Sequence, residues 1–319
     1  MKRLLITRPI AEPVVAQAQE LFDVVVSDDG ALDVAAAAQA LADYDAILPT
    51  LGDQFTAQAF DSAAEKLRCG ILGNFGVGYN HIDVAAAQAA GVQVSNTPDV
   101  LTDATADIGL TLLLATARRA GEGERQVRSG EWGGFGPKNL LGTHVTGKTV
   151  GIVGMGRIGQ AVAHRCHFGF GMPVVFYNRS PKEVALPARQ LDTLPEVMMV
   201  ADFVVVTTPG GAATTHLINA EVLRAMKRSG ILINISRGEV VDETALIKAL
   251  QTRQIAGAGL DVYEAEPHVP ESLRDLENCV LLPHLGSATV ETRQAMGQMA
   301  LDNIIAWSND QTPPQSVWS

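Results

Sequence analysis

The first hundred residues alternate short apolar runs with alanine-rich stretches. Apolar runs of four to eight residues bounded by turn residues predict buried strands, and the alanine-rich stretches between them predict helices. The predicted strands cover residues 3–7, 23–27, 45–50 and 91–96 and the start of 68–83, with helices from about residue 11 and over 31–42. Strands that alternate with helices form a parallel sheet covered by helices, so this part predicts an α/β domain.

A second alternation follows a stretch over 99–119 that is apolar all round, which predicts a long buried helix. Six further strands, with a helix between each and the next, are predicted in KTVGIVGMGRIGQ, PVVFYNRS, ADFVVVTTP, GILINISRG, IAGAGLDV and CVLLPH, starting at Lys148. Six such strands make up a complete dinucleotide-binding domain of the doubly wound type. The last stretch, over 288–307, is predicted to be helical.

The length of 319 residues exceeds what one hydrophobic core usually supports, so we expect two domains. The fold class predicted is α/β with two Rossmann-like domains. A flavodoxin-like substrate domain is assembled from residues 1–98 and 287–319, and a doubly wound parallel-sheet dinucleotide-binding domain covers residues 99–286.

Composition narrows the possible partners. The formal charge of −11 argues against a protein that binds the nucleic-acid backbone, which needs a basic face. The first apolar run has four residues before Arg8, and no stretch approaches 18 apolar residues, so we expect a cytoplasmic protein without a membrane partner. The three cysteines are far apart and show no CxxC spacing, which favours buried free thiols over disulfides or a zinc site, and no metal is expected.

A single G-x-G-x-x-G pattern, formed by Gly154, Gly156 and Gly159, lies between the apolar strand TVGIV and a helical run. In this context the glycines allow a tight turn, close approach of a pyrophosphate, and packing of helix on strand. The helix N-terminus then offers free N–H groups and a positive dipole end. The pattern predicts a dinucleotide site, whereas an ordinary glycine turn is the alternative.

The end of the next strand indicates which dinucleotide is preferred. NAD-specific sites usually place a carboxylate there for the ribose 2′-hydroxyl. This sequence has Asn178, Arg179 and Ser180 instead. A carboxylate would repel a 2′-phosphate, whereas Arg179 and Ser180 can bind one, so NADP(H) is predicted to be preferred, with NAD(H) possible. An exposed turn without a ligand is the alternative.

Three later segments carry polar groups at strand ends: NISRGEVVDE, GLDVYEAEP and LLPHLGS. Together with FGVGYNHID, VLTDATAD and VGIVGMGRIGQA, in this order along the chain, they resemble the D-isomer-specific 2-hydroxyacid dehydrogenases, and more closely their glyoxylate and hydroxypyruvate reductase branch. The resemblance covers essentially the whole length. It implies that a small 2-keto acid and its D-2-hydroxy acid are interconverted by hydride transfer with a nicotinamide cofactor.

The resemblance also implies three catalytic residues. His284 matches the general acid and base, a role that suits an imidazole because it exchanges protons near neutral pH. Glu266 matches the carboxylate that hydrogen-bonds this imidazole and favours its protonated form. Arg237 matches the residue that binds the substrate carboxylate and carbonyl, for which a planar cation is suited.

Further contacts follow from the same resemblance. The substrate is expected to meet the backbone amides of Val77 and Gly78, with Leu51 and Gly52 as the next part of the pocket wall, besides Arg237 and His284. The expected cofactor contacts are Arg157 and Ile158 at the pyrophosphate, Thr208 and Pro209 beside the adenosine, Ile235 and Asp261 near the nicotinamide, and Gly286. Asp261 is expected to accept a hydrogen bond from the carboxamide.

The glycine-rich segment 132–146 carries apolar residues, as the dimer arm of the family does, so a homodimer is expected. Reductases of this branch often carry two tryptophans here, the second reaching the pocket of the partner subunit. This chain has Trp132 followed by Phe135, which leaves the preferred substrate size open.

Other functions remain as alternatives. A phosphoglycerate dehydrogenase of this fold more often has an acid at position 178, and a formate dehydrogenase has glutamine at the position of Glu266. A dehydrogenase for a bulkier, phenylpyruvate-like keto acid is a further alternative, because the shape of the substrate pocket depends on side-chain placement. A nicotinamide-sensing corepressor shares the fold and much of the site but needs a groove for a peptide.

Overall fold

Two parallel sheets, of five and seven strands, organise the chain. The computed structural model describes residues 1–318. The chain divides into two units, Met1–Leu101 with Ser287–Ser319, and Thr102–Gly286. The sequence prediction put the first boundary after residue 98.

The first unit contains the five-stranded sheet in the order β2-β1-β3-β4-β5. This is the flavodoxin-like order, which confirms the predicted fold. The strands are β1 (Arg3–Ile6), β2 (Asp23–Val26), β3 (Ala46–Leu48), β4 (Ile71–Gly73) and β5 (Gln93–Ser95). The helices are α1 (Glu12–Leu21), α2 (Val34–Asp43), α3 (Ala57–Ala63), α4 (Val84–Ala89) and α12 (Val290–Ser308), with a short 3-10 helix over Ala64–Lys66.

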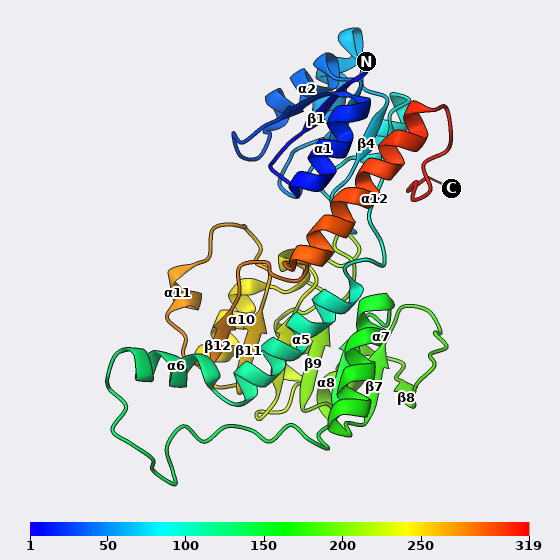
Figure 1. Ribbon diagram of the computed structural model, residues 1–319. Helices are drawn as coiled ribbons and strands as arrows, with labels where there is room; N and C mark the ends of the chain where they lie inside the picture. Colours follow the sequence, from blue (N-terminus) through cyan, green and yellow to red (C-terminus); the bar gives the residue numbers. More distant parts are fainter. Residues whose placement is uncertain (319) are drawn as a thin grey trace. The chain divides into compact units, whose positions relative to one another are not determined.

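Helix α12, far from β4 in sequence, packs against this strand in the first unit (Figure 1). Two glycines permit the close approach. A Cβ on Gly70 would overlap the ring of Trp307, and a Cβ on Gly73 would lie 2.7 Å from Cγ1 of Ile304. The predicted helix over 288–307 is therefore confirmed, and its packing explains the presence of glycine directly before β4, at Gly70, and at its last residue, Gly73. Among residues 1–318, no helix combines the length and apolar character that a membrane crossing requires.

The second unit contains the seven-stranded sheet in the order β12-β11-β10-β9-β6-β7-β8. Its strands are β6 (Val150–Val153), β7 (Val174–Tyr177), β8 (Ala188–Gln190), β9 (Phe203–Val206), β10 (Ile231–Asn234), β11 (Gly257–Leu260) and β12 (Cys279–Leu281). The doubly wound parallel sheet is confirmed. The prediction of six strands missed β8, an edge strand of three residues without an apolar run, and no helix lies between β7 and β8.

Helices cover both faces of this sheet (Figure 1). Residues of α5 (Thr102–Ala117) and α7 (Arg157–His164) share one apolar core with alternate strand residues. Those of α8 (Leu194–Val200), α9 (Ala220–Arg224) and α10 (Glu243–Gln251) share the other. The remaining helices are α6 (Ala120–Arg128), α11 (Glu271–Arg274), a π-helix over Arg165–Gly169 and a 3-10 helix over Gly238–Val240.

The helix predicted over 99–119 is shorter in the structure, because α5 ends at Ala117 and Arg119 turns the chain with a φ of 53°. Helix α6, which follows, is not among the predicted elements. From there to β6 the chain runs over residues 129–149 without helix or strand (Figure 1). We call residues 129–149 the arm.

Candidate active site

The polar motifs of the second unit all follow strands of its sheet. Gly154 follows β6, Asn178 follows β7 and Arg237 follows β10. Asp261 comes directly after β11, and His284 comes shortly after β12. Because the strands are parallel, their carboxyl ends share one edge of the sheet, where ligands of such folds bind. The structure therefore brings these predicted residues to one edge.

Each glycine of the G-x-G-x-x-G pattern has a distinct steric reason. Gly154 has a φ of 97°, and a Cβ on it would lie 2.8 Å from the amide nitrogen of Thr208. A Cβ on Gly159 would overlap the carbonyl oxygen of Gly154, so this glycine lets α7 pack on the turn. A Cβ on Gly156 would have no other atom within 4 Å, so the backbone here is open to a ligand. The pattern therefore forms a tight turn that leaves one face of the backbone accessible.

Two threonines after β9 complete this turn. The Thr207 hydroxyl donates a hydrogen bond to the carbonyl of Gly154 at 2.6 Å. The Thr208 hydroxyl is buried and has no hydrogen-bond partner within residues 1–318. An unpaired buried hydroxyl beside an open glycine turn fits a polar ligand, and the N-terminus of α7 beside it fits a pyrophosphate. A dinucleotide therefore fits this edge of the sheet.

The loop after β7 holds the residues that predict NADP(H) preference. The side-chain amide of Asn178 donates a hydrogen bond to the Ser180 carbonyl at 3.0 Å, which closes a turn around Arg179. Arg179 and Ser180 are both exposed. Asn178 thus shapes the loop, and its neighbours remain accessible for a phosphate.

His284 is held in an uncommon backbone conformation, with a φ of 55°. A left-handed non-glycine residue costs about 1 kcal/mol or more, so neighbouring bonds must maintain it. The amide of His284 donates to the carbonyl of Asp261 at 2.9 Å. Its Nδ1 lies 2.8 Å from Oε2 of Glu266, and each of the two side chains is 29% exposed. The imidazole is thus positioned through both its backbone and its ring.

Glu266 is fixed from a second side, because its Oε1 accepts a hydrogen bond from the amide of Tyr263 at 3.0 Å. Burial acts to raise the pKa of Glu266, but the hydrogen bond and charge of His284, the Tyr263 amide and the charge of Arg237 together hold this pKa below its usual value. The carboxylate is therefore ionised at neutral pH, so Nδ1 of His284 donates to it. This leaves Nε2 as the nitrogen that can exchange a proton with a ligand.

Arg237 lies on a loop that is closely packed against the Glu266 loop. A Cβ on Gly238 would overlap the backbone of Tyr263, so only glycine permits this approach. The buried Asn234 side chain donates to the Arg237 carbonyl at 3.0 Å and accepts from the Ser236 amide at 3.0 Å. Burial lowers the pKa of Arg237, and the charges of nearby carboxylates oppose this shift.

Asp261 has a structural role that the sequence analysis did not predict. Its two carboxylate oxygens accept hydrogen bonds from the amides of Leu285 at 2.7 Å and Gly286 at 2.8 Å. Burial raises the pKa of Asp261, although these two amides act to lower it. Tyr263 adds a further connection, because its hydroxyl donates to the Leu282 carbonyl at 2.9 Å. Asp261 and Tyr263 therefore fix the loop that carries His284.

The predicted substrate-binding residues Val77 and Gly78 belong to the first unit. The buried side chain of Asn74 donates to the carbonyls of Gly76 at 3.0 Å and Gly78 at 3.1 Å, and Asn96 donates to the Val77 carbonyl at 2.8 Å. Within residues 1–318, the amides of Val77 and Gly78 donate to no protein group. The carbonyls of this loop are thus bound by the two asparagine side chains, and the amides of Val77 and Gly78 are left to bind an anion.

Leu51 and Gly52, also in the first unit, follow β3. Leu51 is 40% exposed, and Gly52 has a φ of 102°. Asp53, whose side chain is fully buried, fixes this turn by accepting hydrogen bonds from the Thr50 amide at 2.8 Å and the Leu32 amide at 2.9 Å. Asp53 is not among the predicted site residues, although a carboxylate beside a glycine in a predicted loop is a frequent turn-forming residue.

Comparison with known proteins agrees with these features. The family model of the D-isomer specific 2-hydroxyacid dehydrogenase NAD binding domain matches residues 110–286. A glyoxylate reductase of Thermococcus kodakarensis is 46% identical over 322 residues, which cover 99% of this chain and 96% of the relative. The chain belongs to the D-isomer specific 2-hydroxyacid dehydrogenases. It is an NAD(P)-dependent oxidoreductase that binds a nicotinamide dinucleotide.

Two further relatives of this dehydrogenase bear on substrate and cofactor. A glycerate dehydrogenase of Hyphomicrobium methylovorum is 35% identical, and the match covers 96% of this chain and 95% of the relative. The crystal structure of an NADPH-dependent glyoxylate/hydroxypyruvate reductase from Sinorhizobium meliloti, in complex with NADP and malonate, has a TM-score of 0.88. The two sequences are 38% identical, and the match covers 99% of this chain and 97% of the Sinorhizobium meliloti chain.

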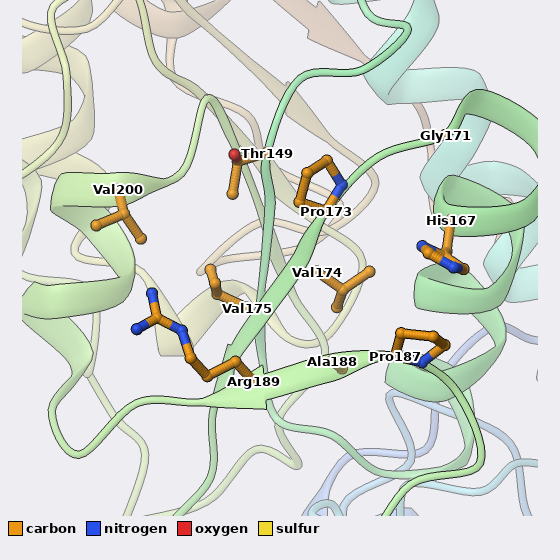
Figure 2. Close-up of a pocket in the computed structure, with 10 residues that line it drawn as sticks. All are labelled: Thr149, His167, Gly171, Pro173, Val174, Val175, Pro187, Ala188, Arg189 and Val200. Carbon is orange, nitrogen blue, oxygen red and sulfur yellow. The ribbon is translucent and has the colours of Figure 1, made fainter.

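A hollow of about 540 Å³ lies elsewhere on the dinucleotide unit of the dehydrogenase (Figure 2). Thr149, Pro173 and Pro187 line it, and these residues directly precede β6, β7 and β8. The hollow is therefore at the amino ends of these strands, whereas the glycine turn is at their carboxyl ends. It does not contain any of the predicted site residues.

Proposed function

We propose that the protein is an NADPH-preferring reductase of small 2-keto acids, such as glyoxylate and hydroxypyruvate, to D-2-hydroxy acids. The observation that carries the proposal is the 2.8 Å contact between Nδ1 of His284 and the ionised carboxylate of Glu266. The names of the glyoxylate reductase and the glyoxylate/hydroxypyruvate reductase relatives support the substrate class.

When bound, the reduced nicotinamide supplies a hydride to the carbonyl carbon of the keto acid. His284, protonated and held through Nδ1, donates a proton from Nε2 to the carbonyl oxygen, which becomes the hydroxyl. In the opposite direction the neutral imidazole accepts this proton. Glu266 keeps the ring oriented and favours its charged form. Arg237 binds the substrate carboxylate and carbonyl through its planar cation.

The preference for NADPH is supported by the loop after β7, which has no carboxylate at position 178 and exposes Arg179 and Ser180. Arg179 pairs with the 2′-phosphate and Ser180 donates to it. The reductase relative solved with NADP is named NADPH-dependent.

The other assignments extend the proposal. In the first unit, the free amides of Val77 and Gly78 bind the substrate carboxylate, and Leu51 and Gly52 contribute to the pocket wall. In the second unit, Asp261 accepts from the nicotinamide carboxamide with the lone pairs that Leu285 and Gly286 leave unused. The remaining cofactor contacts proposed are Gly154, Gly156, Arg157, Ile158, Gly159, Thr208, Pro209, Ile235 and Gly286.

We also propose a cytoplasmic homodimer. All three cysteines are free and buried, which suits a reducing compartment. Dimerisation is supported by the arm, where Phe135 is 92% and Leu141 is 66% exposed, more apolar surface than a monomer ordinarily leaves in one segment.

The decisive experiment measures oxidation of NADPH and NADH at the nicotinamide absorbance with a panel of keto acids. Glyoxylate and hydroxypyruvate should have the highest kcat/KM, and NADPH should exceed NADH with either. In Arg179→Ala, kcat/KM with NADPH should fall, whereas kcat/KM with NADH should change little. A higher kcat/KM with NADH refutes the cofactor preference. A higher kcat/KM with phosphohydroxypyruvate or phenylpyruvate assigns a different substrate, and no turnover with any keto acid favours a nicotinamide-sensing binding protein.

A further inference from the structure

Gln190 makes an unusual set of hydrogen bonds for the last residue of an edge strand. Its side-chain nitrogen donates to the carbonyl of Asn178 at 3.2 Å and to that of Ser180 at 3.1 Å. Its side-chain oxygen accepts from the amide of Lys182 at 3.0 Å. One side chain on β8 thus binds three backbone groups of the loop that follows β7.

Around residues 178–182 this loop has few other hydrogen bonds. Residues 178–187 connect β7 to β8 without a helix. Besides the bonds of Gln190, the Asn178 side chain donates to the Ser180 carbonyl at 3.0 Å. The Ser180 carbonyl therefore accepts two hydrogen bonds, and the backbone is fixed immediately before and after Arg179. The strand itself is held by the ladder, in which Phe176 pairs with Gln190 and the Leu191 amide donates to the Phe176 carbonyl at 2.8 Å.

The same loop carries two cations. Arg179 and Lys182 are both exposed, and neither forms an ion pair with another group within residues 1–318. A long side chain on a mobile loop loses much conformational entropy when it binds a phosphate, whereas a loop that is already ordered avoids most of this loss. The hydrogen bonds of Gln190 order the backbone that carries these cations before any ligand is present.

We propose that Gln190 is a positioning residue for cofactor selectivity, holding residues 178–182 in the shape that receives the 2′-phosphate of NADP(H). The inference rests on the NADPH preference proposed above. Gln190 acts through the loop and does not itself touch the phosphate. Its loss should therefore weaken only the dinucleotide that carries this group.

The test compares Gln190→Met with the wild type. Methionine keeps the length and packing of the side chain while removing its hydrogen-bonding groups. The dissociation constants of NADP+ and NAD+ are measured by calorimetry, and kcat and KM with glyoxylate are measured with both reduced cofactors. We expect the NADP+ dissociation constant and the NADPH KM to rise about tenfold, with NAD+ binding changed less than about twofold and kcat at saturating NADPH maintained. A tenfold change corresponds to about 1.4 kcal/mol, in the range of one or two hydrogen bonds.

Gln251→Met is the matched control, because Gln251 is an exposed glutamine at the end of α10 whose side chain makes no hydrogen bond within residues 1–318. It should leave both dissociation constants unchanged. Equal weakening of NADP+ and NAD+ in Gln190→Met overturns the inference, since Gln190 would then support the sheet edge in general. If Gln190→Met binds both NADP+ and NAD+ as tightly as the wild type does, the inference is also overturned. In that case a wild type that prefers NADP+ still supports the proposed function. A wild type that binds NAD+ more tightly refutes both.

Discussion

Nδ1 of His284 lies 2.8 Å from Oε2 of Glu266, while the other carboxylate oxygen of Glu266 accepts from the Tyr263 amide at 3.0 Å. The carboxylate is therefore bound on both oxygens and gives the imidazole one orientation and one tautomer. Proton exchange with the substrate is left to Nε2. This geometry makes the contributions of the two residues separable by mutation.

Removal of the imidazole should abolish most of the proton transfer. We expect His284→Ala to lower kcat for glyoxylate reduction by about 10² to 10⁴, the usual contribution of positioned acid-base catalysis, with NADPH binding nearly unchanged. Steady-state kinetics and calorimetry measure the two quantities. His164→Ala, an exposed histidine at the far end of α7, is the control and should retain wild-type kcat. A near wild-type rate in His284→Ala would mean that another group supplies the proton.

Neutralising Glu266 should change the pH dependence of the reaction. In Glu266→Gln the amide oxygen can still accept from Tyr263, but the negative charge that favours the protonated imidazole is gone. Keto-acid reduction requires that protonated form, so its kcat profile should move to lower pH. Hydroxy-acid oxidation requires the neutral form, and its active range should extend to lower pH as well. Profiles of both directions in the wild type and Glu266→Gln decide this, and superimposable profiles contradict the coupling.

The same carboxylate should contribute to stability in a pH-dependent manner. The pKa of Glu266 is lowered in the folded protein from an ordinary value of 4.5, with burial opposing and His284, Tyr263 and Arg237 causing the decrease. A carboxylate with a lowered folded pKa stabilises the protein above its unfolded pKa, and this contribution is lost as the pH falls through the folded pKa. The free energy of unfolding of the wild type should therefore exceed that of Glu266→Gln near pH 7, and the difference should shrink below about pH 4.5. Urea unfolding at several pH values measures it, and a constant difference counts against the linkage.

The predictable features are those whose chemistry is local in sequence. The glycines of the G-x-G-x-x-G pattern were recognisable because strand, turn and helix follow one another. His284, Glu266 and Arg237 lie in polar segments at strand ends, and the resemblance of these segments to the family implies their roles. In contrast, β8 has only three residues, alternately half-buried and exposed, so no apolar run marked it. The contacts of Asp261 with Leu285 and of Gln190 with Asn178 join segments that are separate in sequence, and only the folded sheet places them together.

Gly238 should be essential for the position of Arg237. A Cβ at this position would overlap the Tyr263 backbone, so Gly238→Ala must separate the Arg237 loop from the Glu266 loop. We expect a loss of stability of about 1 to 3 kcal/mol from overpacking and a rise in KM for the keto acid. Thermal unfolding and kinetics measure both. Gly169→Ala, at a glycine with open space around its Cβ position, should retain wild-type values. If Gly238→Ala behaves like Gly169→Ala, the close packing of the two loops is unimportant.

The arm should form part of a homodimer interface. Trp132, Phe135 and Leu141 are 59%, 92% and 66% exposed, and these three large apolar side chains occur within one segment that has no helix or strand. Isolated exposed apolar residues are common on monomers, but three of them within ten residues of one irregular segment favour an interaction surface. Sedimentation velocity at micromolar concentration should therefore show a dimer of the wild type.

The double variant Trp132→Ser with Phe135→Ser should weaken dimerisation, because burial of these side chains contributes about 1.5 to 3 kcal/mol each. Phe168→Ser, which removes a 60% exposed phenylalanine outside the arm, controls for a general loss of apolar surface and should remain dimeric. A wild type that sediments as a stable monomer contradicts the dimer, and a double variant that dimerises as tightly as the wild type places the interface outside the arm.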